Sequence, residues 1–166
     1  MLGTLVATLL LGAPPAAPAI ARVTELAVLR HGDPHDGPRV DGTRCQQRKR
    51  QWRCQRFTAR WSATEVNLNA AVLRQPASWR ALKPTVAQAL EARLAAIDLT
   101  TLRDAPEPGR FLHVLLVHRS GRSTRVNFAS GPNPPPAGRP HEAIASALLE
   151  AALESGTPVI AIPARR

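Results

Sequence analysis

Positive charge is concentrated in two acid-free segments of this 166-residue chain, whose formal net charge is +10. No Asp or Glu lies between Asp41 and Glu65, or between Glu107 and Glu142. Arginine presents a planar fork of N–H donors that matches the oxygens of phosphate and carboxylate groups. The pattern therefore predicts that the chain binds an anionic partner: a phosphate-rich polymer, a lipid head group or an acidic protein. We expect the binding residues to be Arg44, Arg48, Lys49, Arg50, Arg53, Arg56, Arg60, Arg119, Arg122 and Arg125.

The same charge has a second interpretation. Arginine is far commoner than lysine here, and alanine and proline are abundant, which a biased base composition produces without selection for binding. Cations on edge strands also prevent edge-to-edge association. A structural or protein-interaction domain with incidental charge is therefore the alternative. Trp52, Phe57 and Trp61 are interleaved with the first set of cations, and we interpret them first as core residues and second as a stacking platform.

The two cysteines, Cys45 and Cys54, have the spacing of a bridge across a β-hairpin. If they face each other, Arg48 faces Gln51 and the tip is Lys49-Arg50. That pair suits a two-residue turn poorly, because such turns need positive φ, so a looser four-residue tip is an equal alternative. Redox motifs place their cysteines two residues apart and structural zinc needs four ligands, so we expect a structural disulfide in an oxidising compartment.

A loop rich in His and Asp follows the first predicted strand. Imidazole and carboxylate groups suit zinc or manganese, but Gly, Pro and Asp in alternation equally describe a solvated turn. We therefore predict no metal and no cofactor. We expect His113 to be a core histidine, and no nucleophile elbow, phosphate-binding glycine loop or dinucleotide fingerprint occurs. The residues of the loop that could ligate a metal are His31, Asp33, His35, Asp36 and Asp41.

The run Leu29-Arg30-His31-Gly32-Asp33 comes directly after a predicted strand and resembles the Arg-His-Gly signature of the histidine phosphatase superfamily. His118, at the end of the apolar run 114–117, is similar to the second histidine of that family. The resemblance implies that Arg30 grips phosphate, that His31 is the nucleophile and that His118 completes the pocket. It also implies a mainly parallel sheet, whereas here a disulfide hairpin follows the first motif.

Residues 2–12 are almost entirely apolar and precede a small-x-small site at Ala19 and Ala21, which is typical of a secretory signal cut after Ala21. No basic residue lies near Met1, although signals of this kind begin with positive charge. We therefore expect a signal peptide over 1–21, a single disulfide-bridged domain over 22–166, and export to the periplasm or the medium.

Apolar periodicity predicts an order of strands, helix, hairpin, helix and strand. This order favours an α+β fold: a mostly antiparallel sheet of two hairpin or meander units, with two helices packed on one face. A small all-β barrel is the alternative and requires both helix predictions to fail. The predicted strands are 23–30, 39–46, 52–61, 65–73, 111–117, 122–129 and 157–162, and the predicted helices are 84–97 and 140–155.

These observations lead us to expect a small basic protein of the cell envelope or secretome, without enzymatic activity, that binds an anionic partner through its arginine-rich hairpins. A structural or interaction domain is the second possibility, and a histidine-phosphatase-like enzyme using His31 is the third. The sequence carries no indication of oligomeric state.

Overall fold

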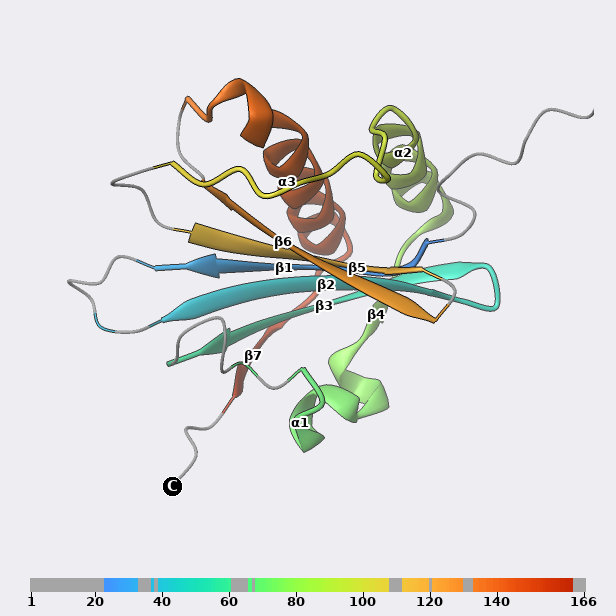
Figure 1. Ribbon diagram of the computed structural model, residues 1–166. Coiled ribbons are helices and arrows are strands. Elements are labelled where there is room, and N and C mark those ends of the chain that lie inside the picture. Colours follow the sequence, from blue (N-terminus) through green and yellow to red (C-terminus); the bar gives the residue numbers. More distant parts are fainter. Residues whose placement is uncertain are drawn as a thin grey trace, which may run out of the picture.

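The computed structural model describes residues 23–32, 37, 39–60, 66, 68–107, 112–119, 121–129 and 133–162 (Figure 1). The expected signal segment 1–21 and Trp61 lie outside this part of the chain. The strands are β1 (Val23–His31), β2 (Val40–Arg48), β3 (Gln51–Ala59), β4 (Arg80–Ala81), β5 (Leu112–Arg119), β6 (Arg122–Ala129) and β7 (Val159–Ile162). The α-helices are α1 (Ala71–Arg74), α2 (Pro84–Ala95) and α3 (Arg139–Glu154), with short 3₁₀ helices at Pro76–Ser78 and Pro136–Gly138.

The strands form one open sheet in the order β4-β3-β2-β1-β5-β6. Every neighbouring pair in this order is antiparallel, and β7 joins the outer edge of β3 in parallel. The predicted α+β fold is confirmed, and the barrel alternative is wrong because the two edges of the sheet do not meet. β7 lies at an edge, as expected for a short strand between two prolines.

The cysteine hairpin has the predicted register. Cys45 faces Cys54 with 4.1 Å between their Cα atoms, and a disulfide joins them. Arg48 faces Gln51, so the tip is the two-residue turn Lys49-Arg50 rather than a looser one. Both tip residues have positive φ, 47° and 65°. The backbone of a tight hairpin turn has therefore been imposed on two residues that prefer negative φ.

Helices α2 and α3 cover one face of the sheet, here called the helix face (Figure 1). Pro84 and Pro140 occupy the first turns of these helices, where a missing backbone N–H costs nothing. Trp52 is buried beneath α2 and its indole N–H donates to Glu91 at 2.8 Å. Within the described residues, no helix is long and apolar enough to cross a membrane.

Val66 and residues 68–79 lie on the opposite face of the sheet, and this corrects one prediction. Residues 65–73 were expected to form a half-buried strand, but 71–74 form the helix α1 and 68–69 form a turn. Val66, Leu68 and Leu73 pack instead over a second apolar cluster that includes Phe57. Alternating apolar residues can also cover a sheet as an irregular segment, so the alternation did not identify a strand here.

Gly42 allows the Phe57 ring to lie flat against β2. The two residues are register partners, and a Cβ atom at position 42 would overlap the ring. The expected consequence of Gly42→Ala is a loss of about 1–3 kcal/mol in the free energy of unfolding, measured by denaturant titration. Gly32→Ala is the matched control, because a Cβ there meets Arg39 at an ordinary 3.4 Å. Equal losses in both variants would show that the ring does not depend on Gly42.

Candidate functional site

The turns of the two basic hairpins lie at the same end of the sheet. β1 is antiparallel to both β2 and β5, so these two flanking strands run in the same direction. Glu25, near the start of β1, pairs with Gln46 on one side and His118 on the other. Both hairpins therefore turn back beyond the start of β1 (Figure 1). The cations gathered at this end, here called the tip cluster, are Arg48, Lys49, Arg50, Arg119 and Arg122.

Four residues of the tip cluster are exposed, and Arg119 is half-buried. None of the described carboxylates lies within ion-pair distance of any member of the cluster. The charge of Arg119 does affect one carboxyl group, that of Asp98. Hydrogen bonds from Thr100 lower the pKa of Asp98, and the positive charge of Arg119 lowers it further. The tip cluster thus carries a surplus of positive charge facing solvent.

Three more of the predicted anion-binding residues point to the face opposite the long helices. Arg44 is largely neutralised, because its guanidinium group donates to both Glu25 oxygens at 2.6 and 2.9 Å. Arg53 and Arg125 have no carboxylate partner among the described residues. With its amide oxygen turned toward Arg53, Gln46 accepts from that guanidinium group at 2.8 and 2.7 Å.

Trp79 forms an aromatic platform under two of these arginines, and the sequence patterns did not single it out. The guanidinium carbons of Arg44 and Arg53 lie 5.3 and 4.9 Å from its ring centroid, within cation–π range. Burial lowers the pKa of Arg53, and the like charges of Arg48 and Arg44 lower it further. An added oxyanion beside Arg53 would relieve this repulsion.

Trp52 and Phe57 are core residues, in agreement with the first interpretation of the aromatics. Both are buried, Trp52 on the helix face and Phe57 on the opposite face. The stacking role suggested for them is therefore not available at the surface. Trp61, the third of the set, lies outside the described residues.

A polar row crosses five strands beside the tip cluster and includes the types of side chain found in serine hydrolases. The Ser123 hydroxyl lies 2.6 Å from His118 Nδ1, and His118 Nε2 lies 3.8 Å from Glu25 Oε1. That carboxylate is already held by Arg44 and is too far from the imidazole for a hydrogen bond. Glu25, His118 and Ser123 of this row line an open hollow of about 360 Å³, and the arrangement is better suited to binding than to nucleophilic catalysis. Its members are Arg53, Gln46, Glu25, His118 and Ser123.

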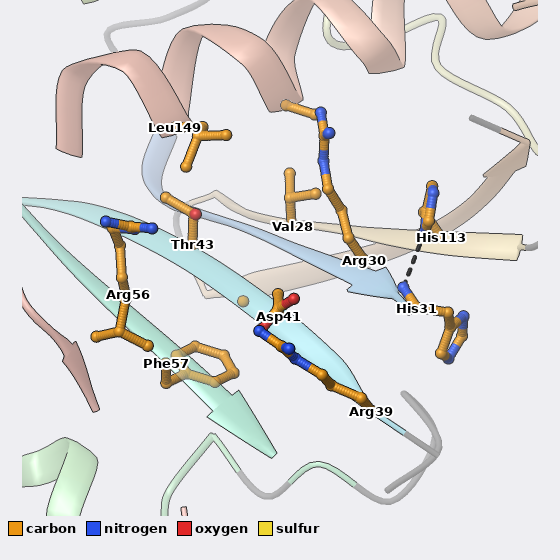
Figure 2. Close-up of a pocket in the computed structure, with 13 residues that line it drawn as sticks. Val28, Arg30, His31, Arg39, Asp41, Thr43, Arg56, Phe57, His113 and Leu149 are labelled. Carbon is orange, nitrogen blue, oxygen red and sulfur yellow. Dashed lines mark hydrogen bonds and ion pairs between the residues drawn. The ribbon is translucent and has the colours of Figure 1, made fainter. Parts of the chain in front are cut away.

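Arg56 and Arg60, the remaining predicted binding residues, lie away from the tips. Arg60 follows the far end of β3 and is exposed. Arg56 is half-buried on the helix face, where it lines a pocket of about 430 Å³ between the sheet and α3. Figure 2 shows it beside Thr43, its register partner on β2, with Leu149 of α3 above. The predicted binding residues therefore lie in four separate places: the tips, the opposite face, the pocket beside α3 and the far end of β3.

The residues that resemble a histidine phosphatase do not form one pocket. His118 pairs with Glu25, six residues along β1 from His31, so the two histidines lie toward opposite ends of the sheet. Arg30 is bound to Glu142 of α3 at 2.9 Å. The sheet is also antiparallel rather than mainly parallel. The array of arginine and two histidines that the resemblance implied is therefore absent from the described residues.

His31 instead meets His113, the histidine expected in the core. His113 is buried, and its Nδ1 accepts the backbone N–H of His31 at 3.0 Å (Figure 2). Burial lowers the pKa of His113, and the charges of Arg30 and His31 lower it further, to about 4. Its neighbour Phe128 stacks in turn on His141, so these rings close one end of the helix-face core.

The metal-binding alternative gains no support from the part of the loop that the structure describes. Asp41 accepts from Arg39 at 3.1 Å. Among the described residues, no group of three or more His, Cys, Asp and Glu side chains could hold a metal ion. Asp33, His35 and Asp36 lie outside the described residues, so their part in the prediction is untested.

No protein-family model, curated protein or solved structure matches this chain.

The lowered pKa of His113 predicts acid sensitivity. Between about pH 6.5 and 4 the unfolded chain binds a proton at this residue and the folded chain does not, so the free energy of unfolding falls as the pH falls through that window. The expected loss at His113 is on the order of 2 kcal/mol, reduced from the full shift because the site is partly solvated. Denaturant titrations at several pH values measure it.

His113→Gln keeps an acceptor for the His31 N–H and removes the titration, so its stability should fall less between pH 6.5 and 4 than that of the natural chain. His118→Gln is the matched control, because it also replaces one histidine with glutamine but leaves the contact between His113 and His31 in place. If the free energy of unfolding of His113→Gln falls as steeply between pH 6.5 and 4 as that of the natural chain, the proton is taken up at another residue.

Proposed function

We propose that this is an exported protein that binds an anionic, phosphate-bearing polymer through the tip cluster and the adjacent polar row. The observation that carries the proposal is the convergence at one end of the sheet of Arg48, Lys49, Arg50, Arg119 and Arg122, without a described carboxylate partner. Cations from two hairpins that are far apart in sequence can there contact several phosphates of one chain.

The conformation of the first hairpin tip supports a functional role for its charges. Lys49 and Arg50 both adopt positive φ, where a residue with a side chain costs roughly 1–2 kcal/mol. Asn-Gly would satisfy the same turn without that cost. Lys49 and Arg50 are also exposed. Backbone strain that is kept at exposed cations is consistent with a role of these two side chains in contacting a partner.

Arg44 and Arg53 pack on the Trp79 ring. This arrangement favours a ligand that carries planar or tetrahedral oxyanions over a partner surface that is only negatively charged. Arg53 has its guanidinium group held by Trp79 on one side and Gln46 on the other, so little freedom remains to be lost on binding. Arginine forks that are already oriented bind phosphate in two-pronged contacts. The positive charge of Arg48, at the tip, also lowers the pKa of Arg53, so an anion bound at Arg53 would reduce the repulsion between them.

Export is the second part of the proposal. The disulfide between Cys45 and Cys54 supports it, because such bridges persist outside the reducing cytosol. No described helix could hold the chain in a membrane as a span. The expected signal segment 1–21 is consistent with the same destination, the periplasm or the medium.

Binding to a long-chain polyphosphate tests the function directly. The affinity of the natural chain should fall linearly on a logarithmic scale with salt, because bound cations are released from the polymer. Lys49→Asn/Arg50→Gly should weaken binding about tenfold at low salt and reduce the salt slope by about 2. Fluorescence anisotropy with a labelled polymer measures both.

Arg60→Gln/Arg74→Gln is the matched control, since it removes two exposed charges away from the tips. It should bind within about twofold of the natural chain. Equal losses in both variants would mean that only net charge matters, and salt-independent binding would rule out the proposed mode. Vesicles of anionic lipid form a parallel arm: tighter binding to them than to the polymer would point to a membrane surface instead.

The same tip substitution predicts a gain in stability. Asn and Gly adopt positive φ more readily than Lys and Arg, so Lys49→Asn/Arg50→Gly should raise the free energy of unfolding by about 1–2 kcal/mol. Denaturant titration of the natural and substituted chains measures the difference. A loss of stability would show that the two side chains make contacts that outweigh the strain.

A further inference from the structure

A second site lies on the helix face, far from the tip cluster. The pocket between the sheet and α3 has a volume of about 430 Å³, within the range of small-molecule sites. β1, β2, β3, β7 and α3 all contribute to its wall, whereas α2 does not. We call it the α3 pocket. Most of its lining residues lie on strands or on α3, where side chains are positioned more precisely than on loops.

The charges in the α3 pocket leave one cation uncompensated. Three guanidinium groups line it, and two of them are paired: Arg30 with Glu142 at 2.9 Å, and Arg39 with Asp41 at 3.1 Å. For Arg56, no carboxylate of the described residues lies within ion-pair distance. A half-buried arginine without a counter-charge is a costly arrangement that a bound anion would correct.

The rest of the pocket wall is largely apolar. The buried side chains of Val28 and Ala145 line it, and Leu149 of α3 lies above Thr43 (Figure 2). Val159 of β7 is 51% exposed although it lines the pocket. One turn along α3 from Leu149, Leu153 is 52% exposed, so an apolar strip leads from the pocket along the helix.

We propose that the α3 pocket binds a single aliphatic carboxylate of medium chain length. Its carboxylate lies against the Arg56 guanidinium group and the Thr43 hydroxyl, and its chain lies along Leu149 and Val159. One uncompensated cation matches one carboxylate, and the two oxygens fit the arginine fork. The exposed apolar side chains give the hydrocarbon chain a surface to cover.

This site is independent of the proposed function. Arg56 projects from β3 to the helix face, whereas Arg53 projects to the opposite face, and Arg56 lies six residues from Arg50 of the tip. Polyphosphate binding at the tips and carboxylate binding in the α3 pocket can therefore fail separately.

Calorimetric titration of the full chain with decanoate, below its micellar concentration, tests the proposal. We expect saturable binding of one decanoate per chain. Arg56→Gln should weaken it about tenfold or more, the loss expected for a hydrogen-bonded charge. Leu149→Gln should also weaken binding, because it removes an apolar contact with the hydrocarbon chain. Decanol, which lacks the carboxylate, should bind more weakly than decanoate. Arg125→Gln is the matched control, because Arg125 lies on the opposite face, and it should bind as the natural chain does.

Several results would overturn the proposal. These are no saturable binding, equal binding of decanol, inorganic phosphate binding as tightly as decanoate, or an Arg56→Gln variant that is folded and binds normally. If Arg56→Gln loses its cooperative unfolding transition, Arg56→Lys serves in its place: it keeps the charge but not the fork, and it should retain part of the affinity. Full affinity in Arg56→Lys would contradict the two-pronged contact.

Discussion

The antiparallel pairing of β1 with both β2 and β5 is the constraint on which the rest of the structure depends. It inserts the first strand between two hairpins that are far apart in sequence and makes their flanking strands run the same way. Any pair of hairpins attached in this manner must turn at the same end of the sheet. The accumulation of positive charge at one end follows from this pairing, not from the charges themselves, which repel one another.

Each face of the sheet holds both paired and unpaired arginines among the described residues. On the helix face, Arg30 and Arg39 have carboxylate partners, and on the opposite face Arg44 is held by Glu25, whose carboxylate is only 13% exposed. Beyond these pairs the chain provides few acids for its many cations. Among the charges without a described carboxylate partner, those of the tip cluster project from the end of the sheet, where water screens them and where a polyanion can reach them. Arg53, Arg125 and Arg56 lie instead on the two faces of the sheet.

Local patterns in the sequence predicted a helix or strand well where a single physical cause determines that element. The spacing of Cys45 and Cys54 predicts the hairpin register, because a bridge between facing strands allows few others. Pro84 favours a helix start, and the apolar residues after it have the spacing of one helix face, so together they predict α2. Residues 65–73 were wrongly predicted as a strand, because alternation describes how a segment is buried and not how its backbone is paired.

The site was less predictable than the fold, because it depends on contacts between distant segments. The charge runs identified the hairpins, but only the position of β1 decides that their tips meet. Trp79 packs against Arg53 and Glu25 binds Arg44, and these contacts orient the two guanidinium groups. Neither Trp79 nor Glu25 belongs to a motif. Similarly, His31 and His113 are ordinary residues in the sequence, and their contact arises from the pairing of β1 with β5. No local pattern could have distinguished the buried Arg56 pocket from the exposed tips.

The most direct measurement of the central claim is a map of backbone amide chemical shifts in the natural chain as polyphosphate is added. We expect the perturbed amides to lie at the tips, in 48–51, 119 and 121–123, and beside Trp79, and we expect salt to reverse the shifts. Perturbation centred on the opposite end of the sheet, around 31, 39–41 and 58–60, would contradict it. A uniform small shift over all exposed arginines would contradict it equally, because the convergence of the two hairpins would then have no functional consequence.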